Sequence, residues 1–236
     1  MNLSTSIYQD MAARTGGSIY IGVVGPVRTG KSTFIKRFME TQVLPYIDNA
    51  YRRDRAQDEL PQSAGGRTIT TTEPKFIPQE AVELKLAGEV TIRVRLVDCV
   101  GFMVEGAAGH LEDGAERLVK TPWYDHEIPF TQAAELGTRK VITDHSTIGV
   151  VVTTDGSFSD LPQETYLDAE NQAISELKKL HKPFLVLVNS SHPSSRTARE
   201  AAERIEKQHS VAAMPVNCAQ LSEEDIRQIM EQILYE

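Results

Sequence analysis

The stretch GVVGPVRTGKST, residues 22–33, matches the phosphate-binding pattern G-x-x-x-x-G-K-[ST] from Gly25 to Ser32. It follows SIYIGVV (residues 18–24), a short apolar run rich in Ile and Val that predicts a buried strand. It leads into KSTFIKRFME (residues 31–40), where apolar residues recur at helical spacing. A strand, a glycine-rich loop and a helix in this order predict a phosphate-binding loop in an α/β fold.

Each part of this loop has a chemical role toward a nucleotide. The glycines let backbone N–H groups converge on phosphate oxygens, and the helix that begins near Lys31 directs the positive end of its dipole toward the same anion. Lys31 supplies a charge to the β- and γ-phosphates, Ser32 completes the ligand shell of Mg²⁺, and Thr33 reaches the α-phosphate. The nucleotide-binding residues predicted here are Gly25, Pro26, Val27, Arg28, Thr29, Gly30, Lys31, Ser32 and Thr33.

A second motif, D-C-V-G (residues 98–101), follows the alternating run VTIRVRLV (residues 90–97). This run and AVELKL (residues 81–86) predict an antiparallel hairpin. At the end of its second strand, Asp98 is predicted to hold Mg²⁺ through water, and the N–H group of Gly101 to bind the γ-phosphate.

Between the two motifs lies the threonine-rich segment GGRTITTTEP, residues 65–74. One threonine in such a loop binds Mg²⁺ and senses the γ-phosphate, which orders the loop in the triphosphate state. We expect Thr70 or Thr71 in this role because the loop ends by Pro74; the alternative is a β-prone run that starts the next strand. The predicted metal ligands are Ser32, Thr70, Thr71 and Asp98, and the predicted catalytic residues are Arg28, Lys31, Thr70, Thr71, Asp98 and Gly101.

The rest of the chain alternates strand and helix patterns. TIGVVVTT (residues 147–154) and PFLVLVN (residues 183–189) are continuous apolar runs, typical of strands that are covered on both faces. Amphipathic helical segments separate them, which predicts a three-layer α/β/α sandwich with a mostly parallel sheet and one antiparallel strand. Residues 1–17 are expected to form an N-terminal helical extension, and residues 18–236 a P-loop NTPase domain.

Two polar segments, residues 48–73 and 99–130, predict long exposed loops. The second contains TPWYDHEIPF (residues 121–130), in which Trp123 and Tyr124 stand among polar residues. Aromatic side chains in such a loop either form a contact surface or fasten the loop to the body of the protein, and the sequence leaves both open.

The bulk properties predict a soluble protein of a reducing compartment. The chain has 236 residues and a net charge of −8, which argues against nucleic-acid binding. It has no apolar run of membrane-spanning length and no signal-peptide pattern at its start, so we expect a cytoplasmic location and no transmembrane segment. Cys99 and Cys218 follow apolar runs and are expected to be buried free thiols.

The phosphate loop, threonine segment, hairpin and D-x-x-G motif resemble the translation-factor-related class of P-loop GTPases. Longer stretches resemble the stage IV sporulation protein A family, a group of ATPases that build the basal layer of the spore coat in endospore-forming bacteria. The resemblance covers nearly the whole chain, and it is carried by GVVGPVRTGKSTFIKRFME, RAQDELPQSAGGRTITTTEPKF, VRLVDCVGF, TPWYDHEIPF and GTRKVITDHSTIGVVVTTDG. Members of this family continue past residue 236, so the chain is expected to be the N-terminal nucleotide-binding domain.

The resemblance implies Mg²⁺-dependent hydrolysis of ATP that drives a conformational change and self-assembly. It also implies as partners further copies of the same protein, a small membrane-associated sporulation peptide and other coat proteins. The implied location is the mother-cell cytoplasm at the outer surface of the forespore. Two other functions remain open at this point: a regulatory GTPase switch, and a scaffold that binds nucleotide without turnover.

The base-contacting segment departs from the GTPase pattern. GTPases of this class carry Asn-Lys-x-Asp after the corresponding strand, whereas this chain has N-S-S-H-P (residues 189–193). The carboxylate that reads guanine through two hydrogen bonds is replaced, so the sequence permits ATP without demanding it. The expected base contacts come from Asn189 and Ser190, and from Asn217 or Cys218 in VNCA (residues 216–219).

Two residues near the γ-phosphate are unusual. Phe102 stands after D-x-x-G, where many relatives place a Gln that orients water, and we expect it to anchor the loop in an apolar pocket. Arg28 either places a fixed cation near the phosphates, like an arginine finger in cis, or is a solvated or salt-bridged loop residue.

Overall fold

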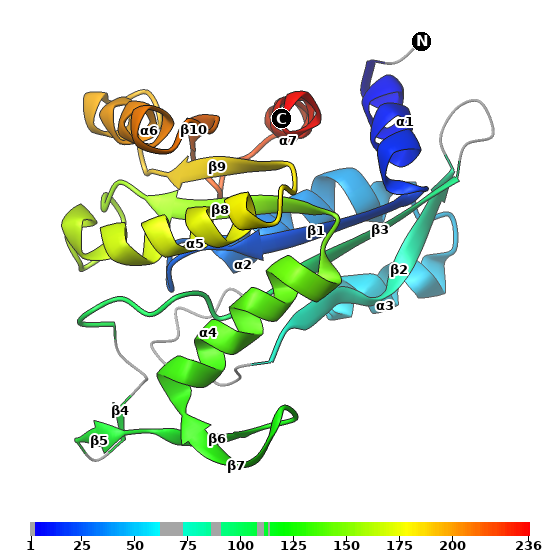
Figure 1. Cartoon of the computed structure of the whole chain (residues 1–236). Helices are drawn as coiled ribbons and strands as arrows, with labels where there is room; N and C mark the ends of the chain where they lie inside the picture. Colours follow the sequence, from blue (N-terminus) through cyan, green and yellow to red (C-terminus); the bar gives the residue numbers. More distant parts are fainter. Residues whose placement is uncertain (1–2, 62–72, 86–90, 108–110, 113) are drawn as a thin grey trace.

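A central six-stranded sheet organises the computed structural model, which describes residues 3–61, 73–85, 91–107, 111–112 and 114–236 (Figure 1). In spatial order the strands are β10 (Ala213–Val216), β9 (Phe184–Asn189), β8 (Ile148–Thr154), β1 (Ser18–Val24), β3 (Thr91–Asp98) and β2 (Lys75–Lys85). All neighbouring pairs are parallel except β2 and β3. The predicted parallel sheet with one antiparallel strand is confirmed.

Helices cover both faces of this sheet, so the predicted three-layer sandwich is also confirmed (Figure 1). One face packs against α1 (Leu3–Thr15), α2 (Lys31–Phe38), α3 (Ala50–Asp58) and α7 (Glu223–Tyr235). The other face packs against α5 (Leu167–Lys179), α6 (Arg196–His209) and the end of the helical segment that begins with α4 (Phe130–Lys140), through Val141 and Ile142. Short π- or 3₁₀-helical turns extend α2 (Met39–Val43 and Leu44–Tyr46) and α4 (Val141–His145) and precede α5 (Gln163–Tyr166).

The apolar runs explain why the sheet is central. All residues of β8 and β9 are buried, as expected for strands with helices on both sides. In β1, Ile19, Ile21 and Val23 point to the side of α2, whereas Val24 points to the side of α5. At about 25 cal/mol for each Å² of apolar surface, these two buried faces supply most of the favourable free energy of folding.

The segment 1–17 contains α1, which lies against the sheet domain. Met11 and Ala12 are buried in the same apolar cluster as β1, and Arg14 donates a hydrogen bond to the carbonyl of Leu234 in α7 at 2.6 Å. None of the described helices is long and apolar enough to cross a membrane.

The segment 48–73 is not the continuous loop that the sequence predicts, because it contains α3. Asn49 caps this helix by accepting a hydrogen bond from the N–H group of Arg52. Only Ala56 of the helix is buried, so its sequence carries no apolar period to reveal it. Residues 62–72, including Thr70 and Thr71, lie outside the described residues.

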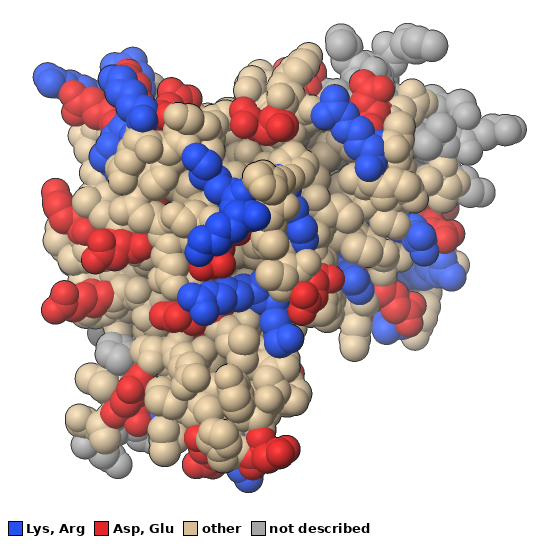
Figure 2. All heavy atoms as spheres, in the orientation of Figure 1, with Lys and Arg blue, Asp and Glu red and all other residues tan. Residues whose placement is uncertain are grey.

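The segment 99–130 likewise contains two short hairpins, which correct the predicted loop. They pair β4 (Leu111–Glu112) with β5 (Ala115–Glu116) and β6 (Leu118–Thr121) with β7 (Tyr124–Pro129). They project from the body below α4 in Figure 1, and in the space-filling view this part shows mainly acidic and uncharged atoms (Figure 2).

The two aromatic residues at the turn of the β6–β7 hairpin have different surroundings. The ring of Trp123 faces Lys140 Nζ of α4 at 5.7 Å, a contact that fastens the hairpin to the helix. Tyr124 stacks beside His126 and is 41% exposed. Trp123 thus fastens the hairpin to the body of the protein, whereas a contact surface at Tyr124 stays a prediction.

Candidate functional site

The predicted site lies where parallel strands end side by side. β1 and β3 are neighbours, and Val23 pairs with Asp98 in their register. The phosphate loop leaves β1 immediately afterwards, so the sheet brings both motifs to one edge. In open α/β sheets this edge, at the carboxyl ends of the strands, is the common place for a ligand.

Two glycines of the phosphate loop occupy positions that exclude any side chain. Gly25 has φ of 131°, and a Cβ atom there would lie 2.3 Å from the carbonyl oxygen of Val152. Gly30 has φ of 98° and caps α2, and a Cβ atom there would lie 2.3 Å from Asn189 Nδ2. The backbone can therefore curve tightly into the start of α2, which is the arrangement that presents N–H groups to a phosphate.

Thr29 fixes the phosphate loop to the neighbouring strand β8. Its side chain is buried, and its hydroxyl group donates to the carbonyl oxygen of Val152 in β8 at 2.6 Å. The side chain of Thr29 therefore acts on the shape of the loop, and its contribution to a nucleotide would come from the backbone. Thr33 is half-buried in the first turn of α2.

Lys31 lies in the hollow of the loop with only 5% of its surface exposed. Its Nζ atom donates to the carbonyl oxygen of Pro26 at 2.5 Å. Burial lowers the pKa of Lys31, which the nearby acidic groups of Cys99 and Asp98 partly oppose. An anionic partner stabilises the charged form of a desolvated ammonium group, so a phosphate bound beside Lys31 would stabilise its charge.

Ser32 and Asp98 meet across the two motifs. Ser32 Oγ donates to Asp98 Oδ2 at 2.8 Å, and the other carboxylate oxygen accepts from the N–H group of Cys99 at 3.0 Å. Burial raises the pKa of Asp98, although the hydrogen bond from Ser32 and the charge of Lys31 act in the opposite direction.

This pair has the chemistry of a magnesium site that is completed by substrate. A hydroxyl and a carboxylate oxygen are ligands that Mg²⁺ prefers, and Mg²⁺ in NTPases usually has few protein ligands beside phosphate and water. Within the described part of the chain no cluster of three His, Cys, Asp or Glu residues is found. The residues therefore fit Mg²⁺ held jointly by Ser32, Asp98 and the phosphates of a nucleotide.

The D-x-x-G segment is fastened to the phosphate loop. The N–H group of Phe102 donates to the carbonyl oxygen of Gly25 at 3.0 Å, and that of Val27 donates to the carbonyl oxygen of Phe102 at 2.9 Å. The Phe102 side chain is fully buried, which confirms its predicted role as an anchor. Gly101 lies beside it with φ of 100°, and its N–H group donates to Thr138 Oγ1 of α4 at 3.2 Å.

Sequence reasoning missed Thr138. A threonine inside a helix pattern, 37 residues away along the chain, gives no sign that it contacts Gly101. Arg28 is exposed with φ of 61°, and the structure leaves both of its interpretations open.

The base-contacting segment is tied to the phosphate loop by Asn189. This residue is 8% exposed; its Nδ2 donates to the carbonyl oxygen of Thr29 at 2.9 Å, and its Oδ1 accepts from the N–H group of Cys218 at 3.0 Å. Ser190 is also buried, and its Oγ accepts from the N–H group of His192 at 3.0 Å. The three residues predicted to contact the base therefore make hydrogen bonds that hold these loops together.

The side chain of Cys218 packs in the apolar core, and burial raises the pKa of its thiol to about 12. Both cysteines are free and buried, as predicted. Beside the segment an open cavity of about 400 Å³ is lined mainly by polar residues, among them Asp155, Ser157, Ser190 and His192.

Comparison with known proteins gives consistent results. Residues 2–236 match the family described as stage IV sporulation protein A, ATPase domain. The stage IV sporulation protein A of Clostridioides difficile (strain 630) is 51% identical over 234 residues, which cover 99% of this chain and 48% of that protein. The protein of the same name from Bacillus subtilis (strain 168) is 48% identical over 230 residues, covering 98% and 47%.

Among solved structures, a crystal structure of a variant of SsGBP aligns with a TM-score of 0.49 and 12% identity, covering 99% of this chain and 65% of that one. The chain spans about half the length of the curated relatives that it matches. From the match of almost every residue and the identity near one half, the chain belongs to the stage IV sporulation protein A family, and it corresponds to the ATPase domain of that family.

Proposed function

We propose that this domain binds ATP with Mg²⁺ and hydrolyses it to ADP and phosphate. The observation that carries the proposal is the contact of Ser32 with Asp98 at 2.8 Å, beside the buried ammonium group of Lys31. These three groups come from two motifs more than sixty residues apart, and together they form the metal and phosphate half of a P-loop NTPase site.

The residues would share the work of binding and charge stabilisation. The N–H groups of the loop from Gly25 to Ser32 and the charge of Lys31 bind and orient the β- and γ-phosphates. Ser32 and Asp98 hold Mg²⁺, which when bound neutralises charge on the phosphate oxygens. The N–H group of Gly101 binds a γ-phosphate oxygen. Since Phe102 is buried and cannot hydrogen-bond through its side chain, it does not orient water, and slow turnover by the domain alone is expected.

We propose ATP rather than GTP because His192 stands where a guanine-reading carboxylate would be. The amide of Asn189 is engaged with Thr29 and Cys218, so it holds the two loops in register. Base contacts from Ser190 and Cys218 would come from their backbone carbonyl groups, because both side chains are buried and both N–H groups already donate, that of Ser190 to Val216 and that of Cys218 to Asn189.

We further propose that hydrolysis drives a conformational change in the longer protein and its self-assembly into the basal layer of the spore coat. Thr70 and Thr71 are the proposed γ-phosphate sensors and additional Mg²⁺ ligands. Other coat proteins and a small membrane-associated sporulation peptide are proposed partners, in the mother-cell cytoplasm at the forespore surface. The family membership supports this proposal.

Phosphate release measured with ATP and GTP side by side tests the reaction and the base together. We expect Mg²⁺-dependent release that is faster with ATP. In the same assay Lys31→Ala should lose phosphate release. Its matched control is Lys36→Ala, on the outer side of α2, which should keep the rate of the unmodified protein. A preference for GTP of about tenfold or more, equal to 1.4 kcal/mol, would show that the choice of ATP is wrong.

The base argument has a second test, which rebuilds Asn-Lys-x-Asp by combining Ser190→Lys with His192→Asp. We expect a shift toward GTP in competition binding, because the new carboxylate can accept two hydrogen bonds from guanine. The single change His192→Asp is the control that separates base reading from altered charge. No shift in the double variant, with the fold retained, would mean that the base is read elsewhere.

A further inference from the structure

A buried hydrogen bond links the D-x-x-G glycine to α4. Thr138 is fully buried, and its hydroxyl group donates its only proton to the carbonyl oxygen of Ala134 at 2.8 Å. Toward Gly101 the same oxygen must therefore act as an acceptor, and it receives the Gly101 N–H group at 3.2 Å. The N–H group of Gly101 is thus held by a helix that lies outside the phosphate-binding and D-x-x-G motifs.

The backbone of Gly101 lies directly against the phosphate loop. A Cβ atom at this position would be 2.3 Å from the carbonyl oxygen of Gly25 and 2.6 Å from Lys31 Nζ. A backbone N–H group makes one strong hydrogen bond, so a bond to Thr138 and a bond to a phosphate oxygen exclude each other. Because Phe102 is held by two backbone bonds to the loop, we expect a change of acceptor to be confined to the peptide that precedes Gly101.

We propose that Thr138 Oγ1 competes with the γ-phosphate for the Gly101 N–H group, and that Thr138 is a positioning residue that sets the preference of the site between ATP and ADP. The inference rests on the proposed function, in which Gly101 binds the γ-phosphate. ADP lacks that phosphate and leaves the Gly101–Thr138 bond in place. ATP must break this bond in order to bind, so ATP binds less tightly than it would if Thr138 were absent.

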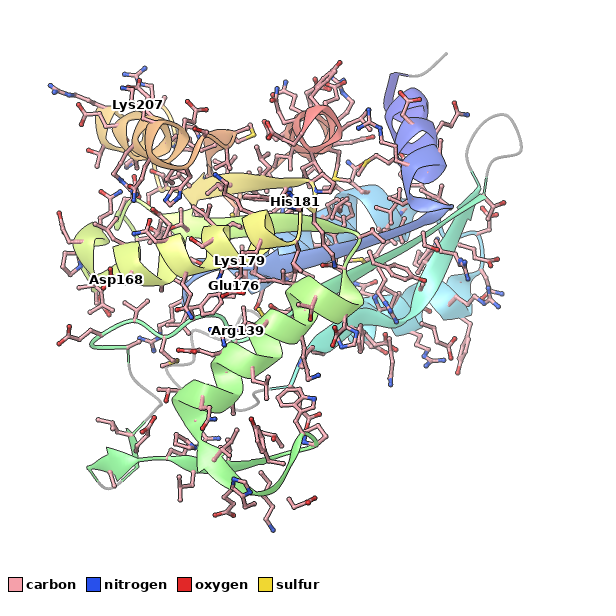
Figure 3. The ribbon with its side chains drawn as sticks, in the orientation of Figure 1. Arg139, Asp168, Glu176, Lys179, His181 and Lys207 are labelled. Atoms are coloured by element: carbon pink, nitrogen blue, oxygen red, sulfur yellow. The ribbon has the colours of Figure 1, made fainter. Side chains whose placement is uncertain are left out.

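The helix that contains Thr138 also carries a projecting hairpin. Thr138 is followed by Arg139, which lies beside Glu176 of α5 at 3.7 Å, so this end of α4 is attached to the body (Figure 3). The other end begins at Phe130, whose N–H group donates to the carbonyl oxygen of Arg117 next to β6. The helix that loses a hydrogen bond when ATP binds is therefore the helix that carries the β6–β7 hairpin.

Thr138→Val tests the inference, because valine keeps the branched shape and removes the acceptor. Without the Thr138 acceptor, the Gly101 N–H group loses its bond of 3.2 Å and keeps only the weaker sulfur acceptor of Cys99 beside it, so it gains more from the γ-phosphate. We expect the ratio of affinities for a nonhydrolysable ATP analogue and ADP to rise about fivefold, the factor that an average hydrogen bond of about 1 kcal/mol is worth. Thr138→Ser keeps a hydroxyl group and should keep the original ratio.

Thr143→Val is the matched control. Thr143 donates to the carbonyl four residues earlier, as Thr138 does, but it is exposed and lies in the turn Val141–His145 that follows α4. Its loss should leave the ratio unchanged. If Thr138→Val does not fold, the amide signal of Gly101 in the unmodified protein, followed by nuclear magnetic resonance, should shift further with the ATP analogue than with ADP.

The outcomes separate this inference from the proposed function. If the unmodified protein binds no ATP, both fail. If it binds and hydrolyses ATP while Thr138→Val keeps the ratio within about twofold, or weakens both nucleotides equally, Thr138 is only structural and this inference alone is wrong. An identical response of the Gly101 amide to ADP and to the ATP analogue would also overturn it.

Discussion

Asn189→Ala should destabilise the domain by about 2–6 kcal/mol, because it removes the side chain that joins two buried backbone groups. The change leaves the carbonyl oxygen of Thr29 and the N–H group of Cys218 without their hydrogen bonds of 2.9 and 3.0 Å. Each buried group left unpaired costs about 1–3 kcal/mol. Nucleotide affinity should fall as well, since the phosphate loop and the last base-contacting loop would no longer be held together.

Urea unfolding followed by circular dichroism measures the effect as a lower midpoint at an unchanged slope. Asn217→Ala is the matched control: Asn217 is half-buried, lies in the same loop cluster, and makes a long contact of 3.5 Å to Ser191 and one bond of 3.1 Å to the N–H group of Ala219. Its loss should cost about 1 kcal/mol or less. A loss below about 1 kcal/mol for Asn189→Ala, or equal losses for the two variants, would refute the reasoning.

Three further outcomes are expected. Lys31→Ala should abolish nucleotide binding or turnover while the protein stays folded, because the lysine faces the phosphate hollow; equilibrium binding with unmodified affinity would remove Lys31 from the site. Asp98→Asn should lose Mg²⁺-dependent phosphate release and yet unfold at a higher temperature near neutral pH. Burial raises the pKa of Asp98, so its ionised form destabilises the fold, and the advantage of the asparagine should vanish as the pH falls to about 4 and the acid is protonated. Thr70→Ala combined with Thr71→Ala should keep ATP affinity and lower phosphate release at least about tenfold, or 1.4 kcal/mol of barrier; parallel loss of both would mean that these threonines support the structure of the site.

Patterns of local origin could be predicted from the sequence. The run before Gly25 is a strand because its side chains are covered on both faces, and Asp98 lies beside the phosphate loop because β1 and β3 are parallel neighbours. The antiparallel pairing of β2 with β3 followed from alternation of apolar residues on the two strands. Such features depend on the order of residues within one or two elements.

Features that depend on packing between distant elements could not be predicted. The helix α3 buries Ala56 alone, and its other side chains are solvated, so no apolar period marks it. The engagement of Asn189 with Thr29 and Cys218 joins three separate loops, and the contact of Thr138 with Gly101 joins a helix to a loop. The sequence shows which side chains are able to make these hydrogen bonds. Which groups they bond to depends on how the fold brings distant segments together.

The two buried cysteines make the site observable in a way that needs no bound ligand. Cys99 follows Asp98, and burial raises the pKa of its thiol to about 11; Cys218 bonds through its N–H group to Asn189. Protonated, enclosed thiols react slowly with alkylating reagents, so modification requires local opening of the segment that holds them. Alkylation at Cys99 therefore reports opening beside the phosphate loop, and alkylation at Cys218 reports opening of the base-contacting segment. Measured with and without nucleotide, the two rates show how far each half of the site closes when a nucleotide binds.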